Sequence, residues 1–528
     1  MELVYLWVEE YKNVKKQGFN FSPRFECEFK DEYDDKGKIK DNCELIIKEK
    51  KDYVSIFPDN INVTAIVGKN GSGKSSIGEV LRDIFINSKL NNRKNHILLY
   101  RKNNGDNFCD SSIHIKNNNL NCIYKKINKD LRLYLSQDSY SKDMMIDRHK
   151  VFSVSSSEKS TINSLLNNKI INTSDSFEIT SFMYIPKKIK IELKDIEVMM
   201  NESILKEIGG WRYLSDNSFL EAVKKTIVDA FSNKYYQYLA YTYITYAYEE
   251  KDEDFTYNIQ DQKILVEILK EKKLFLEEKS FDKISNGIDT DLSQLDEDTK
   301  NIIQNGNCLE CLDIDFTDEE DRNYNNLSSG EKQIFGQLLN IYFYSHEHTN
   351  NQLYFLDEPD NMLHPNWQKS YVKELYTLLK KLKINFHFIL ATHSPFLLSD
   401  LPKENVIFLE KEEKTGNCIN ASDKVDLNPF GANIHTLLSH GFFMKDGLMG
   451  EFAKEKINTA IKYLNQTKLS EKELEYCENI ISIIGEPIIK RQLQKMLDSK
   501  RLKKVDKIDD IEKQILKLSQ ELKSLKND

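Results

Sequence analysis

The sequence predicts an α/β fold in which a mixed or parallel sheet carries a phosphate-binding loop, is split by a largely helical insertion and precedes a helical C-terminal region. Three observations predict it. A β-branched run at 61–67 (INVTAIV) leads directly into a glycine-rich loop, and an amphipathic helical pattern follows at 75–90. Helix and strand patterns alternate again from residue 327, and helical patterns dominate from residue 454. Alternating strands and helices indicate βα units, which build parallel sheets.

The same patterns divide the 528 residues into four expected ranges. Residues 1–90 are an N-terminal lobe with the phosphate-binding loop, and residues 327–412 are a C-terminal lobe with the other site motifs. Residues 91–326, rich in Asn, Lys and Ser, are expected to form a mainly helical insertion. Residues 413–528 are expected to be helical and to end in a short coiled coil, or alternatively in a helix packed on its own domain. The apolar positions of that helix are spaced by three and four residues: Ile508, Ile511, Ile515, Leu518, Leu522 and Leu525.

Composition and charge exclude several classes of protein. Hydrophobic residues make up 40% of the chain, enough for a sizeable core, and the net charge of −9 argues against a general binder of polyanions. Short basic clusters, such as the one at 187–190, are typical of a solvated surface, with contact to nucleic acid as the alternative. No run approaches the roughly 18 apolar residues of a membrane span, and the N-terminus lacks a secretory signal. We therefore expect a cytoplasmic protein without membrane contact.

Two further compositional features indicate no site by themselves. The eight cysteines are mostly scattered, as free thiols would be, and the pair Cys308 and Cys311 lacks the second pair that a zinc site needs. A Tyr-rich stretch at 235–248 favours packing between helices over a stacking surface for a partner.

Residues 68–75 (GKNGSGKS) follow the GxxxxGK[ST] pattern between a strand and a helix. Glycines let such a loop curl so that its backbone N–H groups face phosphates, and the helix N-terminus adds its positive dipole end. We expect Lys74 to reach the β- and γ-phosphate oxygens of ATP, and the Ser75 hydroxyl to bind Mg²⁺. The expected ATP-binding residues here are Gly68, Asn70, Gly71, Ser72, Gly73, Lys74, Ser75 and Ser76.

A second apolar strand, 352–356, ends in two carboxylates, Asp357 and Glu358. A strand that ends in Asp places this side chain at the carboxyl edge of a parallel sheet, where phosphates bind. Asp357 is therefore the predicted Mg²⁺ partner beside Ser75, and Glu358 the predicted catalytic residue that orients the attacking water. Strands often end in acids without a function, but a phosphate-binding loop needs such a partner.

Two more motifs complete the predicted site. His393 follows the apolar strand 386–390 and can donate a hydrogen bond to a γ-phosphate, so it is counted with Lys74 and Glu358 as catalytic. Ser328 opens a helix whose first-turn N–H groups can bind an anion. Because one helix cannot hold the same phosphate from the same side as the loop, this anion site is expected to serve a second subunit.

The motifs GKNGSGKSS, LSSGEKQ, LDEPD and THS, in this order, resemble the ABC-type ATPase heads of the SMC, RecN and RecF group and of the overcoming-lysogenization-defect ATPases. This resemblance implies a homodimer in which two heads enclose two ATPs. It implies that Ser328 and Gly330 contact the γ-phosphate from the opposite subunit, and that Asp360 signals across the dimer. The sequence departs from the family at Ser329, where the signature usually has glycine. The glutamine loop of the family is not placed.

The segments 429–435 (PFGANIH), 441–443 (GFF) and 450–453 (GEFA) resemble the PtuA-type ATPases of Septu and retron anti-phage defence systems. That resemblance implies an HNH nuclease partner of the PtuB kind and, in a retron, a reverse transcriptase with its RNA–DNA product. The expected function is an ATP-binding and hydrolysing regulatory subunit, a homodimer or larger assembly, that controls the nuclease.

Three other functions fit the sequence less well. An SMC- or RecN-like DNA-repair ATPase would need long heptad arms, and 91–326 has none of the required length. An ATPase-nuclease of the overcoming-lysogenization-defect kind would need a Glu and a DxD cluster after His393, whereas the sequence offers only DKVD at 423–426. A transporter ATPase is disfavoured by an insertion of this size.

Overall fold

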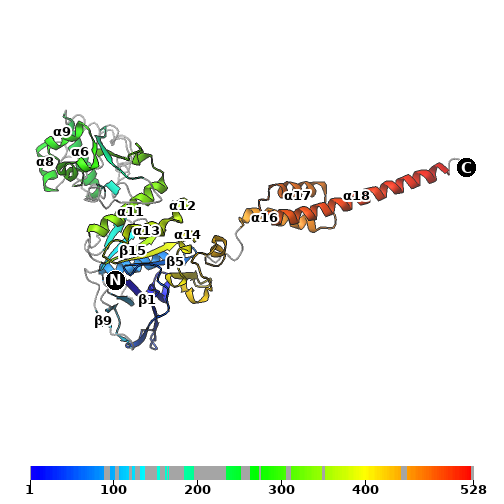
Figure 1. Ribbon diagram of the computed structural model, residues 1–528, viewed down its shortest axis with the longest axis horizontal. Helices are drawn as coiled ribbons and strands as arrows, with labels where there is room; N and C mark the ends of the chain where they lie inside the picture. Colours follow the sequence, from blue (N-terminus) through cyan, green and yellow to red (C-terminus); the bar gives the residue numbers. More distant parts are fainter. Residues whose placement is uncertain are drawn as a thin grey trace. The chain divides into compact units, whose positions relative to one another are not determined.

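The computed structural model describes residues 2–87, 95–101, 106–117, 122–124, 131–136, 151–154, 161–162, 165, 184–195, 233–250, 262–272, 275–304, 311–347, 351–441 and 449–524. The chain forms two compact units, Met1–Phe443 and Met444–Asp528. Figure 1 shows the central sheet of the first unit and the helices of the second.

The first unit is built on a sheet of twelve strands among the described residues, in the order β11-β10-β15-β16-β5-β17-β18-β2-β1-β6-β7-β9. The first six strands in this order are parallel: β11 (Val151–Val154), β10 (Leu131–Ser136), β15 (Asn351–Asp357), β16 (Phe386–Thr392), β5 (Ile61–Gly68) and β17 (Val406–Lys411). The other six, with both parallel and antiparallel pairings, are β18 (Cys418–Asn420), β2 (Val14–Asn20), β1 (Glu2–Tyr11), β6 (His96–Arg101), β7 (Asn107–Ser111) and β9 (Cys122–Tyr124). The predicted mixed α/β fold is confirmed.

Helices cover both faces of the parallel strands (Figure 1). On one face, α1 (Lys74–Asn87) buries the apolar side chains that its sequence pattern predicts: Ile77, Val80, Leu81 and Ile84. On the other face lie α11 (Ser329–Glu347), α13 (Tyr371–Leu379) and α14 (Pro395–Ser399), together with the short α12 (Pro365–Gln368) that precedes α13. Each fully buried aliphatic side chain stabilises the fold by about 1.5–3 kcal/mol, so α1 is held firmly against the strand that precedes it.

The N-terminal strands form a second layer. β1 is buried on both sides: Leu6 and Val8 face the core under α1, whereas Tyr5 and Trp7 face a small sheet. That sheet has the order β3-β4-β8, with β3 (Phe25–Lys30), β4 (Cys43–Glu49) and β8 (Ile115–Asn117). The tight β1–β2 hairpin turns at Lys12 and Asn13, beside the phosphate-binding loop.

The range 91–326 is not mainly helical where it is described between residues 96 and 193, because strands β6 to β12 fill it. Five of them (β6, β7, β9, β10 and β11) extend the large sheet, and a short apolar run cannot be assigned to strand or helix by periodicity alone. The rest of the range combines helices with the sheet β13-β12-β14. Its elements are β12 (Lys188–Leu193), α6 (Lys234–Glu250), α8 (Gln262–Glu271), α9 (Glu278–Ser285), β13 (Ile288–Asp291), α10 (Glu297–Gln304) and β14 (Leu312–Thr317).

The Tyr-rich stretch lies on α6, and its described side chains favour the packing interpretation. Tyr235, Tyr238, Tyr241 and Tyr243 are buried. The Tyr235 hydroxyl donates to the Leu276 carbonyl at 2.6 Å, so its polar end is satisfied inside the fold. Cys311 is buried, and Cys308 lies outside the described residues.

The second unit is a helical bundle with its own core. It consists of α16 (Glu451–Asn465), α17 (Glu471–Ile483) and α18 (Pro487–Ser524), whose buried residues include Leu464, Ile481 and Leu493. α17 begins at a capping box formed by Ser470 and Glu473. Within the described part of the chain, no helix of either unit is long and apolar enough to cross a membrane.

Candidate nucleotide-binding site

Three parallel strands bring the predicted site residues to one edge of the sheet. β16 lies between β5 and β15, and Ala391 is in register with Ile66 on one side and with Asp357 on the other. The loops that follow the three strands therefore start at the same edge. These loops carry the glycine-rich segment, the acidic pair and His393, which is the arrangement expected where parallel strands bind phosphates.

The glycine-rich loop has the backbone of an anion cradle. Gly71 and Gly73 have φ angles of +73° and +110°, which disfavour any residue with a Cβ atom. A Cβ atom on Gly68 would lie 2.4 Å from the Leu409 carbonyl oxygen, so this glycine permits the loop to pass next to β17. The hydroxyl of Ser72 is buried without a hydrogen-bond partner among the described residues, as expected of a polar atom that awaits a ligand.

The Lys74 side chain lies at the carboxyl edge of the parallel strands, and the residue is only 6% exposed. Its Nζ donates to the Gly68 carbonyl at 3.0 Å and lies 2.7 Å from Nε2 of His393. Burial lowers the pKa of Lys74, while the nearby Glu358 and Asp357 carboxylates act to raise it. A phosphate can replace these neutral acceptors, because its negative charge adds Coulomb attraction to the ammonium of Lys74.

His393 is neutral in this arrangement. Burial, and then the Lys74 ammonium, lower the pKa of His393, and the carboxylates of Glu358 and Asp357 only partly oppose this. Its Nε2 accepts from Lys74 and is 3.7 Å from Glu358 Oε1. A nitrogen that accepts this bond carries no proton, so Nε2 is not a donor in this arrangement.

The acidic pair is held by the strands on either side. The Asp357 N–H donates to the Ser136 hydroxyl at 2.9 Å, which ties the end of β15 to the end of β10. The Glu358 N–H donates to the Ala391 carbonyl at 2.7 Å. Glu358 has a φ angle of +47°, a conformation that is uncommon for residues other than glycine and that often occurs at functional sites. This turn directs Glu358, whose side chain is 43% exposed, toward the pocket in front of the glycine-rich loop.

Asp360 belongs to a buried polar network behind the acidic pair. Its Oδ1 accepts from the Thr392 hydroxyl at 2.9 Å, and the Gln368 amide donates to its carbonyl at 3.0 Å. Burial raises the pKa of Asp360, although the hydrogen bonds to Thr392 and Ser394 act in the opposite direction. The network links the loop after β15 to the loop after β16, which carries His393.

Ser328 and Gly330 lie at the start of α11 and do not line the pocket at the glycine-rich loop. Ser328 is exposed and forms a reciprocal cap with Glu331: its N–H and hydroxyl each lie 2.7 Å from Glu331 Oε2. Gly330 packs so closely that a Cβ atom would lie 2.6 Å from the Met362 carbonyl oxygen. The start of α11 is therefore capped by its own side chains and lies outside this pocket.

An open pocket of about 500 Å³ lies in front of the glycine-rich loop. Six predicted residues line it, namely Asn70, Gly71, Gly73, Lys74, Ser75 and Ser76, together with Glu358. The lining also contains residues without a motif in the sequence: Lys12, Asn13, Lys411 and Gly416. No local pattern marks these four residues, because the fold brings them to the pocket from the β1–β2 and β17–β18 turns.

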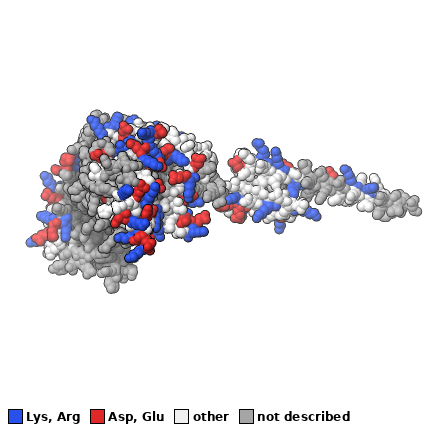
Figure 2. All heavy atoms as spheres, turned by 90° about the horizontal axis from the view of Figure 1, so that it is seen from below, with Lys and Arg blue, Asp and Glu red and all other residues white. Residues whose placement is uncertain are grey.

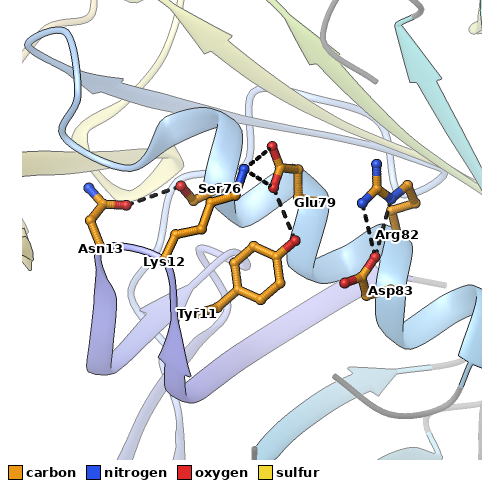
Figure 3. Close-up of polar contacts among 7 residues, drawn as sticks. All are labelled: Tyr11, Lys12, Asn13, Ser76, Glu79, Arg82 and Asp83. Atoms are coloured by element: carbon orange, nitrogen blue, oxygen red, sulfur yellow. Dashed lines mark hydrogen bonds and ion pairs between the residues drawn. The ribbon is translucent and has the colours of Figure 1, made fainter. Parts of the chain in front are cut away.

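The β1–β2 turn is fastened to the loop and to α1 (Figure 3). The Asn13 amide donates to the Gly71 carbonyl at 3.0 Å, and its oxygen accepts from the Ser76 hydroxyl at 3.0 Å. Lys12 pairs with Glu79 of α1 at 2.7 Å, and the Tyr11 hydroxyl donates to the same carboxylate at 3.0 Å. The turn therefore fixes the position of the loop relative to the helix that begins at Lys74.

Ser75 and Asp357, the predicted Mg²⁺ residues, fit such a role by chemistry and position. A hydroxyl and a carboxylate are oxygen donors, and Mg²⁺ typically takes one or two such ligands together with phosphates and water. Ser75 lines the pocket, and Asp357 is near enough to act on the pKa of Lys74. Among the residues the structure describes, no cluster of three or more His, Cys, Asp or Glu could hold a metal alone.

The described basic clusters do not form a continuous basic area. Lys187 pairs with Glu319 at 3.5 Å and Lys190 with Glu192 at 2.9 Å. Figure 2 shows Lys and Arg interleaved with Asp and Glu over the described residues of the face in view. This pattern favours a solvated surface for these clusters.

The family described as "AAA domain, putative AbiEii toxin, Type IV TA system" matches residues 63–399, a range that extends from β5 to α14 and includes every motif of the site. The chain belongs to this family. The prediction of an ABC-type ATPase from the four motifs is thereby confirmed.

Relatives of this AAA-family chain include the "Retron Vc95 probable ATPase" of Vibrio cholerae serotype O1 biovar El Tor, 23% identical over 429 residues that cover 72% of this chain and 74% of the relative. Among solved structures, the SMC head domain from Thermotoga maritima is 12% identical and covers 80% of this chain and 99% of its own, with a TM-score of 0.25. The recombination mediator protein RecF is 13% identical, with coverages of 79% and 98% and a TM-score of 0.24.

Proposed function

We propose that this protein binds ATP with Mg²⁺ at the edge of β5, β15 and β16 and hydrolyses it. One observation carries the proposal. Lys74, Asp357, Glu358 and His393 come from three distant parts of the chain, and the Lys74 ammonium interacts with the other three. A structural ion-pair network would need no glycine cradle beside it, whereas phosphoryl transfer needs both.

Each of these residues has a separate role in the proposed hydrolysis. The loop N–H groups and Lys74 hold the phosphates, and Ser75 and Asp357 would hold Mg²⁺, which neutralises charge on the phosphate oxygens. Glu358 orients a water so that its oxygen attacks the γ-phosphorus as the bond to the ADP oxygen breaks. The proton of the water passes to Glu358 or to the departing phosphate. His393, once it carries a proton on Nε2, donates to the γ-phosphate.

The site is completed by a second copy of the chain. Ser328 and Gly330 lie at the start of α11, which is absent from the pocket lining, and a helix N-terminus can bind an anion once the capping carboxylate of Glu331 moves aside. In the proposed head-to-head dimer, this helix end contacts the γ-phosphate held by the loop of the opposite subunit. Asp360, through its buried bond to Thr392, transmits the state of the γ-phosphate to the interface.

Two substitutions test hydrolysis. Lys74→Ala is expected to abolish both ATP binding and turnover, because it removes the cation that compensates the phosphates. Glu358→Gln is expected to abolish turnover while ATP remains bound, which traps the paired state. The measurements are phosphate release, ATP retention on a desalting column, and mass in solution with ATP. A Glu358→Gln protein that hydrolyses ATP at the normal rate would refute the assignment.

We further propose that hydrolysis controls a partner HNH nuclease in a bacterial anti-phage complex. The similarity to a retron ATPase over 72% of this chain supports a retron setting, with a reverse transcriptase and its RNA–DNA product as additional partners. Co-purification from the native operon, followed by identification of bound proteins and nucleic acid, tests this proposal. Recovery of the ATPase alone, with neither nuclease nor nucleic acid in the presence or absence of ATP, would contradict it.

A further inference from the structure

One lysine of the pocket has no role in the hydrolysis proposed for it. Lys411 is the last residue of β17, and its side chain lines the pocket in front of the glycine-rich loop. β17 pairs with β5 in parallel, with Leu409 opposite Gly68, so the end of β17 lies alongside the start of the loop. The sheet that carries Lys74 to the pocket therefore carries Lys411 there as well.

The side chain of Lys411 passes between two glycines. A Cβ atom on Gly416 would lie 3.5 Å from Cε of Lys411, and a Cβ atom on Gly71 would lie 3.8 Å from its Nζ. Both glycines have a φ angle of +73°, a conformation that disfavours any residue with a Cβ atom. The ammonium of Lys411 thus lies next to the middle of the glycine-rich loop, and its methylene groups lie against the β17–β18 turn.

The turn that follows Lys411 is closed by its own backbone and fastened to its neighbour. The Glu412 N–H donates to the Asn417 carbonyl at 2.8 Å, which closes the β17–β18 turn. The Cys418 N–H donates to the Asn13 carbonyl at 2.7 Å, which ties β18 to the β1–β2 turn. Since the β1–β2 turn is itself bonded to the glycine-rich loop, Lys411 enters the pocket from a backbone that is fixed relative to this loop.

The positive charge of Lys411 has no counterpart in the part of the chain that the structure describes. Its exposed ammonium forms no hydrogen bond or ion pair there. Lys12, the other lysine at the mouth of the pocket, is paired with Glu79 at 2.7 Å (Figure 3). Lys411 can therefore gain an anionic partner from a ligand without giving up a bond within the protein.

The order of the strands indicates which part of a nucleotide lies on the side of Lys411. Glu358 follows β15 and His393 follows β16, whereas Lys411 ends β17, on the other side of β5. In the proposed hydrolysis, Glu358 and His393 act on the γ-phosphate. The phosphate chain would then extend from the side of β15 and β16, across the loop that follows β5, toward the side of β17.

We propose that Lys411 binds the α-phosphate of the nucleotide, which is the phosphate farthest from Glu358 and His393. This proposal rests on the proposed function of the pocket and adds a residue that binds the nucleotide without taking part in hydrolysis. ATP and ADP share the α-phosphate, so Lys411 contributes equally to the binding of both. Lys74, which contacts the β- and γ-phosphates in the proposed function, does not.

A matched pair of variants in the full chain tests the role of Lys411. Lys411→Met keeps a long unbranched side chain and removes the charge, whereas Lys414→Met removes a charge from an exposed residue of the same turn that does not line the pocket. Binding of ATP and ADP with Mg²⁺ is measured by calorimetry in a Glu358→Gln background, which prevents hydrolysis. We expect Lys411→Met to raise the Kd of both nucleotides by the same factor, about 5- to 20-fold, for the loss of one charge-assisted contact.

Lys414→Met should bind both nucleotides as the Glu358→Gln parent does, and the loss in Lys411→Met should shrink at high salt, because exposed charges are screened. Weaker binding of ATP with unchanged binding of ADP would place Lys411 at the γ-phosphate and overturn the proposal. Equal affinities of Lys411→Met and Lys414→Met, in a parent that binds ATP, would overturn it and leave the ATPase proposal intact. A parent that binds neither nucleotide would overturn both proposals.

Discussion

The turn at Asn13 is predicted to set the affinity for ATP although it belongs to no nucleotide-binding motif. Its side chain joins the middle of the glycine-rich segment to the first turn of α1: it donates to the carbonyl of Gly71 and accepts from the hydroxyl of Ser76. The loop carries two glycines in the left-handed region, and such a segment loses more conformational freedom than others when it is ordered. Without Asn13, more of this ordering must occur when ATP binds.

The expected size follows from the two hydrogen bonds that Asn13→Ala removes. A neutral hydrogen bond contributes about 0.5–1.5 kcal/mol net, and the bond to Gly71 is exposed, so a total of about 1–2 kcal/mol is reasonable. Since each 1.4 kcal/mol changes an equilibrium constant tenfold, ATP affinity should fall by about 5- to 30-fold. The rate of hydrolysis at saturating ATP should change less, because Asn13 contacts the loop and not Glu358.

The assay is a titration with a fluorescent ATP analogue, with Lys15→Ala as the matched control from the same hairpin. Lys15 does not line the pocket and forms an exposed ion pair with Glu10, and exposed pairs contribute about 0–1 kcal/mol. If Asn13→Ala binds ATP as tightly as Lys15→Ala does, the proposed ordering of the loop is wrong.

Two further predictions concern stability. Burial lowers the pKa of His387 to about 3, below an unfolded value near 6.5, so the unfolded chain binds the proton first and stability falls as pH drops below 6.5. The free energy of unfolding by urea should fall by about 2 kcal/mol between pH 7 and pH 5, and a His387→Asn variant that keeps the same slope would contradict this. Gly330→Ala should destabilise the protein by about 1–3 kcal/mol, because the new Cβ would lie 2.6 Å from the Met362 carbonyl oxygen. The exposed neighbour Ser329→Ala should be nearly neutral, and equal midpoints for the two variants would show that the close packing at Gly330 is unimportant.

The sequence predicts well those features that local patterns encode. The strand–loop–helix at 61–87 and the strands that end at Asp357 and Thr392 lie where their patterns place them, because a buried strand beside a glycine-rich loop has few alternatives. Parallel alignment of these strands then makes the proximity of Lys74, Glu358 and His393 a consequence of topology.

Prediction from the sequence fails where a residue contacts a partner that is distant in the chain. Asn13 acts on Gly71 only because the β1–β2 hairpin lies beside the loop, and Ser136 supports Asp357 only because β10 pairs with β15. The strands between residues 96 and 193 are a further case. The periodicity of a short apolar run fits either a strand or a helix, and the strand with which it pairs is not visible in the local sequence.

The central claim is that two chains share each ATP site, and complementation between two inactive variants tests it most directly. One chain carries Lys74→Ala, which disables its loop, and the other carries Ser328→Arg, which blocks its helix end. When the two are co-expressed with different tags and isolated as a mixed complex, one shared site contains the intact loop of one chain and the intact helix end of the other. We predict that the mixed complex hydrolyses ATP although neither variant does so alone. A mixed complex as inactive as its parents would contradict the shared site.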